Sequence, residues 1–300
     1  MGVSLRGSPH AWARALLVAN IGIVLTGALV RLTDSGLGCP RWPKCDADRW
    51  TTHPALGIHG AIEFGNRLLT YVLVAIAVGA VASVWRWQGS TASMRRLAIG
   101  LAAGIPLQGV IGGLTVLTDL NPWLVSLHLI LSMVLISGTV VLIDQLASRP
   151  RVRASATARR MVVLTGVLTT VVVYLGTIVT GSGPHAGDAA APRNGLDSYV
   201  FSHIHGFGAY LLVGATVACV VLLRGPARKA ASALLAIEIA QAVIGVAQYN
   251  AGLPVALVAA HVLGAALLVA AASAMTVRAL RGDGQPMKGS AAAATNNNAK

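Results

Sequence analysis

Three histidines lie where their imidazole rings could bind iron. His128, His205 and His261 occur in separate apolar stretches, each about five to eight residues from one end of its stretch. Ionisable side chains inside a membrane are costly and usually functional, and imidazoles from different helices at one depth are typical axial ligands of haem. A zinc site needs a tetrahedral ligand set, and no Cys or carboxylate accompanies these residues. One such histidine alone would more often bond a neighbouring helix, but three at matched depth favour haem.

A carboxylate and an arginine form a second group with chemical potential. Glu63 and Arg67 are four residues apart in an apolar stretch, so on a helix they share one face. They could form an ion pair that only neutralises both charges, or the carboxylate could act on a bound substrate. Glu238 occupies another apolar stretch away from the histidine layer, and the sequence assigns it no role.

Two of the three cysteines could form a disulfide within one short segment. Cys39 and Cys45 are close in sequence in a segment between two apolar stretches. On an oxidising side of a membrane they could form a disulfide, although a short loop gives limited stabilisation; two unpaired thiols are the alternative. Cys219 is expected to pack in a core. Residues 180–194 combine glycines with polar groups, which could hold haem propionates or form a plain turn.

The elements that must position these residues are membrane helices. The 300 residues are 55% hydrophobic and 11% charged, whereas soluble domains carry about 25% charged residues. A membrane helix needs about 20 mainly apolar residues. We therefore predict an all-α integral membrane protein with eight transmembrane helices. The predicted spans are Trp12–Val30, Leu56–Val84, Leu97–Leu117, Trp123–Leu146, Met161–Thr180, Tyr199–Leu223, Ala230–Tyr249 and Pro254–Val277.

The distribution of basic residues predicts orientation. Most Lys and Arg residues lie before the first span, after the last, and in alternate connections. The positive-inside rule places those segments and both termini in the cytoplasm, so the net charge of +13 reflects topology rather than nucleic-acid binding. The tail, residues 282–300, has the composition of a disordered segment. The densest basic cluster is Arg149, Arg151, Arg153, Arg159 and Arg160.

An internal repeat divides the chain into two halves. Gln108 and Gln241 open similar apolar strings, and 20 residues later each string reaches a histidine, His128 or His261. Four spans in each half give a parallel repeat with an axis along the membrane normal. We predict two pseudo-symmetric four-helix bundles, residues 12–146 and 161–277, whose interiors are common cofactor sites.

The two halves differ at one candidate ligand. His205 and His261 could bind one haem from opposite faces, and His128 corresponds to His261. Asn66 takes the place that His205 has in the second half. His59 lies two helical turns before Asn66, where it would be a substitute ligand or, as we favour, an outer-surface residue.

These residues resemble the haem A synthase family, membrane enzymes that make haem A for terminal oxidases. The resemblance covers about residues 12–277, and its outer-loop strings are specific. The matching strings are Val30–Pro40 with Trp42 and Pro43, Ile62–Phe64 with Arg67, Gly113–Thr118 with Leu127 and His128, and Val179–Asp188.

The resemblance implies an oxidoreductase that converts haem O to haem A by oxidising the C8 methyl to a formyl group through successive hydroxylations. It implies haem b iron held by His205 and His261 in the second half. It further implies that the first half binds the substrate haem O, with His128 on the haem O iron and Glu63 as the catalytic carboxylate.

The resemblance also implies a loop disulfide between Cys39 and Cys45, as in many bacterial members, and a location in the bacterial plasma membrane. It names haem O as partner, with haem O synthase and an electron carrier as further candidates, and no nucleic acid. One departure concerns Asn66, where the family usually has His; Asn is a poor haem ligand, so haem O would be five-coordinate or His59 would move in.

Two other functions fit part of the pattern. A membrane di-haem cytochrome b that only carries electrons would need no haem O pocket. A haem transporter would need a route open alternately to each side, and the cytoplasmic halves of most spans lack the polar residues for one.

Overall fold

The computed structural model describes residues 8–147 and 154–280. Within these residues the fold is all-helical, and eight helices are long and apolar enough to cross a membrane, as predicted. The predicted tail at residues 282–300 and the arginines at 149, 151 and 153 lie outside the described residues. The elements are α1 (Pro9–Leu32), the short 3₁₀ helix η1 (Pro54–Leu56), α2 (Gly57–Arg86), α3 (Ala92–Leu117), α4 (Pro122–Leu146), α5 (Ala156–Ser182), α6 (Ser198–Leu222), α7 (Gly225–Asn250) and α8 (Val255–Leu280).

Polar side chains fix where most of these helices begin. Backbone N–H groups in the first turn have no partner within the helix, and a side-chain oxygen just before the helix can accept from them. Such caps start α1, α3, α4, α5 and α6 at Ser8, Thr91, Asn121, Ser155 and Asp197. The apolar stretches that follow then continue as helices because every backbone polar group is satisfied within the helix.

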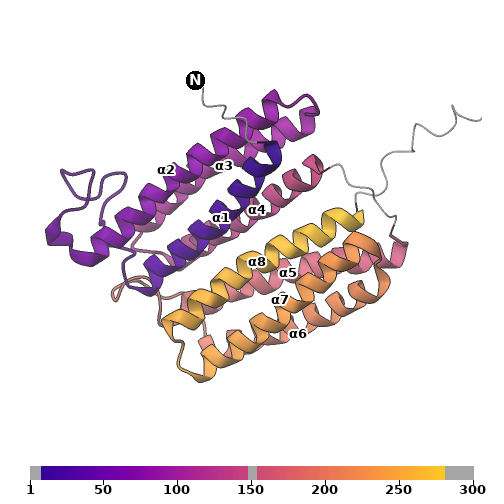
Figure 1. Ribbon diagram of the computed structural model, residues 1–300. Coiled ribbons are helices and arrows are strands. Elements are labelled where there is room, and N and C mark those ends of the chain that lie inside the picture. The colour runs from indigo at the N-terminus through magenta and orange to yellow at the C-terminus, as the bar shows by residue number, and fades with distance from the viewer. Residues whose placement is uncertain (1–7, 148–153, 281–300) are drawn as a thin grey trace, which may run out of the picture.

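The helices form two groups of four, α1–α4 and α5–α8, which lie side by side in Figure 1. In the first group α1 and α3 each pack against α2 and α4; in the second, α5 and α7 each pack against α6 and α8. The groups meet where α1 and α4 contact α8, and where α4 contacts α5. This arrangement is compatible with the predicted repeat of two four-helix bundles, called below the N-terminal and C-terminal halves.

Two loops at one end of the bundle connect the halves. These outer loops are residues 33–53, between α1 and η1, and residues 183–197, between α5 and α6. Arg31, at the end of α1, donates from Nε to the His185 carbonyl at 2.6 Å and from an η nitrogen to the Thr180 carbonyl at 2.8 Å. The backbone N–H of Gly36 also donates to the carbonyl of Gly187 at 2.8 Å. The outer face thus joins the two halves through a charged side chain and the main chain.

Candidate functional site

The structure brings His205 and His261 together. They project from α6 and α8, each about two turns from the outer end of its helix, and their ring centres lie 6.3 Å apart with an angle of 73° between the planes. Two imidazoles that bind one iron from opposite sides, each about 2 Å from the metal as in other metal–imidazole bonds, have ring centres about 6 Å apart. The pair therefore has the separation that a shared iron requires, and we call it the paired-histidine site.

Hydrogen bonding leaves the pair suited to a metal. His205 Nδ1 lies 3.0 Å from the carbonyl oxygen of Val172, which can only accept, so Nδ1 carries the proton and Nε2 keeps its lone pair. Metal-binding histidines commonly donate the second ring nitrogen in this way. His261 Nδ1 is buried without a hydrogen-bond partner among the described residues. The donor set and its spacing fit a haem with two histidine ligands.

Glycines on the facing helices give the rings their space. A Cβ atom at Gly176 of α5 would stand 3.2 Å from His205 Cε1, and one at Gly245 of α7 would stand 3.4 Å from His261 Cε1. The distance at Gly176 is tighter than an ordinary contact and that at Gly245 is at its limit, so a larger side chain at Gly176 would displace the His205 ring.

Replacing Gly176 with leucine is therefore expected to move the His205 ring and, for a haem held by the pair, to remove most of its low-spin absorption from the purified protein. Gly214→Leu on α6 is the matched control, because a Cβ there meets nothing within 4 Å. Absorption spectra of the two variants, normalised to protein, test the expectation. An unchanged spectrum in Gly176→Leu would show that the ring position near this glycine is not needed for binding.

The N-terminal half repeats the part of this arrangement that contains His261 and Gly245. His128 on α4 lies against Gly112 of α3, where an added Cβ would stand 3.3 Å from His128 Cε1. Its Nδ1 is buried without a hydrogen-bond partner among the described residues. Gln108 of α3 donates from Nε2 to the carbonyl of His128 at 2.9 Å and so ties the two helices together at this level. In the part of the chain that the structure describes, no hydrogen-bond partner therefore competes with a ligand for this nitrogen.

Asn66 on α2 is the residue that corresponds to His205 in the repeat. Its amide lies beside Gly27 of α1, as His205 lies beside Gly176 of α5. The Asn66 carbonyl oxygen accepts a hydrogen bond from Thr26 Oγ1 at 2.8 Å. The side chain is therefore held by α1, and the N-terminal half offers one imidazole at this level.

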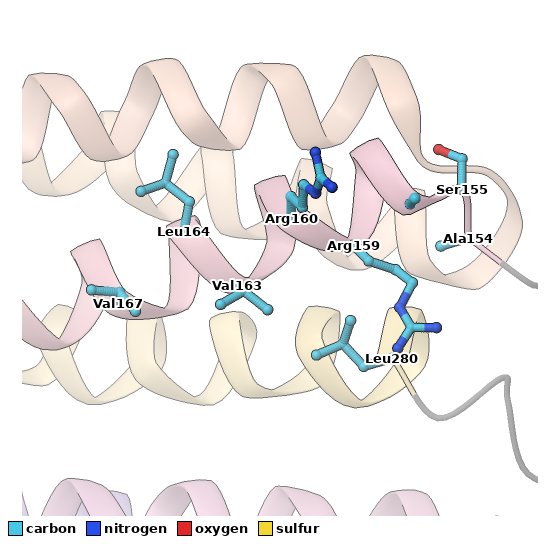
Figure 2. A pocket seen from close by; sticks show the side chains of 9 residues that line it. Ala154, Ser155, Arg159, Arg160, Val163, Leu164, Val167 and Leu280 are labelled. Carbon is cyan, nitrogen blue, oxygen red and sulfur yellow. The ribbon is translucent and has the colours of Figure 1, made fainter.

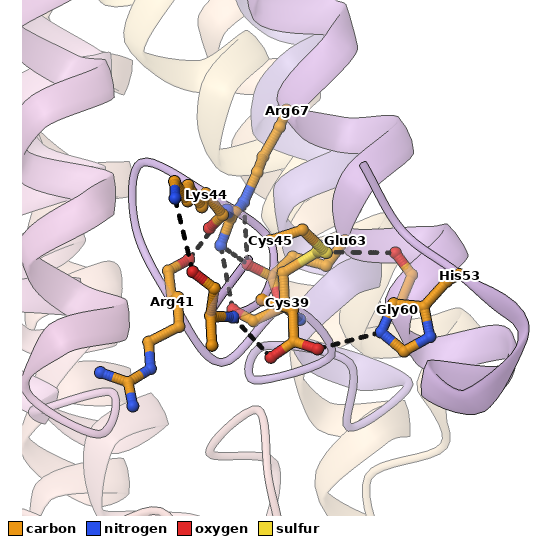
Figure 3. Close-up of a disulfide and its surroundings, with 10 residues drawn as sticks. Cys39, Arg41, Lys44, Cys45, His53, Gly60, Glu63 and Arg67 are labelled. Carbon is orange, nitrogen blue, oxygen red and sulfur yellow. Dashed lines mark hydrogen bonds and ion pairs between the residues drawn. A yellow bond between two sulfur atoms is a disulfide. The ribbon is translucent and has the colours of Figure 1, made fainter. Parts of the chain in front are cut away.

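Glu63 anchors the disulfide loop, residues 39–45, at the outer end of α2 (Figure 3). Cys39 and Cys45 form a disulfide. The Glu63 side chain is buried, its Oε2 accepts from the Cys39 backbone N–H at 2.6 Å, and its Oε1 accepts from Arg67 Nε at 3.1 Å. Glu63 thus forms an ion pair with Arg67, and the carboxylate also holds a backbone group.

Arg67 completes the attachment of the disulfide loop. Its η nitrogens donate to the carbonyls of Cys39, Arg41 and Lys44, at 3.1, 3.0 and 3.1 Å. The loop also reaches across the bundle, because the ring of Trp42 lies against the bare backbone of Gly113 on α3. A charged side chain and an aromatic ring thus fix the disulfide loop over the outer end of the N-terminal half.

The other histidines near these sites have different partners. His59 is exposed, and its Nδ1 lies 3.0 Å from Ser35 Oγ. His203 is exposed as well and stacks near Tyr199. His53 bonds Asp46, whose pKa lies below its ordinary value mainly because the Ala47 backbone N–H donates to the carboxylate and secondly because His53 does.

Sequence reasoning missed two positioning residues. Arg31 was visible only as one member of an outer-loop string, and its carbonyl partners lie about 150 residues away. Thr26 gave no signal, because a threonine in an apolar helix is common and its bond to Asn66 depends on packing. An arginine at the end of an apolar span, followed by a polar turn, is the pattern that would have singled out Arg31.

A groove at the opposite end of α5 is separate from these sites. Figure 2 shows Arg159 and Arg160 beside an apolar wall formed by α5 and Leu280 of α8. None of the predicted site residues lines it. Its basic side chains lie at the end away from the outer loops, which agrees with the predicted distribution of positive charge.

Fold and sites together define a multi-pass helical membrane protein that holds facing imidazoles inside a four-helix bundle. A family model described as cytochrome oxidase assembly protein matches residues 10–55 and 58–273. The chain belongs to this family, and the predicted resemblance to haem A synthases is confirmed by its relatives.

Three curated relatives are each named Heme A synthase. The protein of Rhizorhabdus wittichii is 25% identical over 88% of this chain and 92% of its own length. The protein of Symbiobacterium thermophilum is 28% identical over 70% of this chain and 73% of its own. The protein of Methylorubrum populi is 27% identical over 59% of this chain, and the match spans only 55% of that relative.

Proposed function

We propose that the chain is a haem A synthase that oxidises the C8 methyl of haem O to a formyl group through successive hydroxylations. The observation that carries the proposal is the paired-histidine site, in which His205 and His261 face each other at a separation of 6.3 Å between ring centres. Support also comes from the names of the relatives, which share this chain's family.

In the proposed mechanism the C-terminal half holds a haem b, which supplies one-electron transfer when bound. His205 and His261 would hold it. The Val172 carbonyl holds the Nδ1 proton of His205 and so presents Nε2 to the metal. Because Gly176 and Gly245 have no side chains, the helices beside the two histidines leave room for both rings. These residues act by binding and orientation.

In the N-terminal half, haem O would be the substrate. His128 would bind its iron from one side, and Asn66, held by Thr26, leaves the other side without an imidazole. Glu63 would act as the catalytic carboxylate by stabilising developing positive charge or by handling protons near the reacting methyl. Arg67 and the disulfide loop keep that carboxylate oriented and cover it from water.

The proposal extends to location and partners. The chain would lie in a bacterial plasma membrane with both termini in the cytoplasm, and both outer loops would face the oxidising side, where the disulfide is stable. Haem O would reach it from a haem O synthase, and an electron carrier would exchange electrons with the haem b.

Haem extraction and chromatography test the proposal directly. Protein purified from cells that make haem O is expected to contain haem B together with haem O or haem A, and the cells are expected to accumulate haem A. Cells lacking the chain are the control. Haem B in the protein with no formyl haem anywhere would instead support a membrane cytochrome b that only carries electrons, and it would contradict the proposal.

A further inference from the structure

The C-terminal half contains a buried carboxyl group that the paired-histidine site does not use. Glu238 on α7 is only 4% exposed, and its Oε1 accepts a hydrogen bond from Thr216 Oγ1 on α6 at 2.7 Å. Its Oε2 is buried without a hydrogen-bond partner among the described residues. A buried polar atom without a partner calls for an explanation, and an ionisable residue within a membrane span is a functional candidate.

Two more buried side chains continue from Glu238 toward the face opposite the outer loops. Cys219 lies one turn beyond Thr216 on α6, and its Sγ is 3.4 Å from Oγ1 of Thr165 on α5. Since α6 ends and α5 begins at that opposite face, the series leads from the middle of the bundle toward it. We call these four residues the polar column: Thr165, Thr216, Cys219 and Glu238.

The N-terminal half is apolar at the corresponding positions. The spacing that pairs Gln108 with Gln241 also pairs Ile105 with Glu238. The spacing between Asn66 and His205 pairs Ala77 with Thr216 and Ala80 with Cys219. The spacing between Gly27 and Gly176 pairs Leu16 with Thr165. All four counterparts are buried in one hydrophobic core cluster: Leu16, Ala77, Ala80 and Ile105. A bundle of this arrangement therefore packs without polar residues here, so folding alone does not explain the polar column.

The polar column lies within electrostatic reach of the paired-histidine site. Glu238 precedes Gly245, the glycine beside His261, by two turns of α7, which is about 10 Å along the helix. At that separation in a medium of low dielectric constant, an added electron attracts a proton to a nearby acid.

We propose that Glu238 exchanges one proton with water in step with each electron that the paired-histidine site gains or loses. The inference rests on the proposed haem b at that site. When a reductant of the quinol class gives up one electron to the site, Glu238 Oε2 takes up one proton and the carboxylate becomes a neutral acid. When the electron leaves, that O–H bond breaks and the proton returns to water through the polar column.

Few other groups could account for such an exchange. On α6, Thr216 bonds Glu238, and Cys219 one turn further along lies beside Thr165 of α5. The other titratable side chains of α6 lie nearer its outer end; they are Tyr199, His203, His205 and Tyr210. No titratable side chain occurs on α8 between His261 and Arg278. Glu238 is thus the carboxyl group inside the described C-terminal half that can carry the proton.

Redox titration of the haem-loaded protein at several pH values tests the proposal. The midpoint potential of the haem is expected to fall as the pH rises, because oxidation releases a proton, and Glu238→Gln is expected to lose more than half of that slope. Tyr210→Phe, which removes an exposed titratable group from α6, is the control and should keep the slope because the carboxyl group and the polar column remain.

Infrared difference spectra provide a readout that requires no variant. Reduction of the native protein is expected to produce a carbonyl band of a protonated carboxylic acid, and Glu238→Gln should lack it. The proposal is overturned if the native protein shows no such band, or if Glu238→Gln retains both its haem and the full slope. Absence of haem b from the native protein would instead refute the proposed function.

Discussion

Replacing His205 with alanine is expected to abolish the low-spin absorption of the haem b that we propose for the paired-histidine site. The variant removes one of two imidazoles whose ring centres lie 6.3 Å apart. Hydrogen-bond partners of metal ligands are worth about 10- to 100-fold in affinity, so loss of a ligand should cost at least that much. His261→Ala should have the same effect, because both rings would bind the same iron. Absorption spectra and haem content per protein are the measurements.

His203→Ala is the matched control for this prediction. His203 is two residues from His205 on α6 but exposed, with Tyr199 and Tyr249 as its ring neighbours. Its replacement should leave the haem spectrum unchanged and so separates ligation from any general disturbance of the helix. A full low-spin spectrum in both His205→Ala and His261→Ala would remove the basis of the proposed function.

Replacing Glu63 with glutamine is expected to lower haem A formation by at least about a hundredfold, the usual contribution of a positioned acid or base, while haem b stays bound. Glutamine preserves the size of the side chain and can still accept from the Cys39 backbone N–H. It loses the negative charge that faces Arg67 and, as proposed, the substrate. Haem extraction after expression with haem O measures the product, and the absorption spectrum reports the haem b.

Because Glu63 also holds the disulfide loop, a second pair of variants must separate anchoring from chemistry. Arg67→Lys removes the forked donor that reaches the carbonyls of Arg41 and Lys44 but keeps a positive charge beside Glu63. Cys45→Ser opens the loop and leaves the carboxylate in place. Both should form several times more haem A than Glu63→Gln does. Equal losses in all three would assign Glu63 an anchoring role only.

Membrane helices were predictable from sequence because each span satisfies its backbone internally and needs only length and low charge. The predicted span Met161–Thr180 falls within α5, and Tyr199–Leu223 differs from α6 by one residue at each end. The ends were harder to predict, because caps such as Ser8 and Ser155 lie outside the apolar stretches.

The residues of the candidate sites were predictable from sequence only where an ionisable residue interrupts an otherwise apolar helix. Histidines in apolar helices stand out, and the repeat placed His128 and His261 at equivalent positions. The bonds that orient them were not predictable. The partner of His205 is a backbone carbonyl, that of Val172, and any residue in that position offers the same group. Contacts of this kind depend on how two helices are rotated about their axes, which apolar composition does not specify.

The bonds made by Arg31 restrict how the molecule can move. A carrier that opens alternately to each side would have to part the halves at the outer face and withdraw this guanidinium from the carbonyls of Thr180 and His185. Hydrogen bonds from charged donors contribute about 1.5–3 kcal/mol each, and the main-chain bond from Gly36 to Gly187 adds to the barrier. Because these bonds hold the outer ends of the two halves together, the molecule is better suited to chemistry on a bound porphyrin than to passage of that porphyrin across the bilayer.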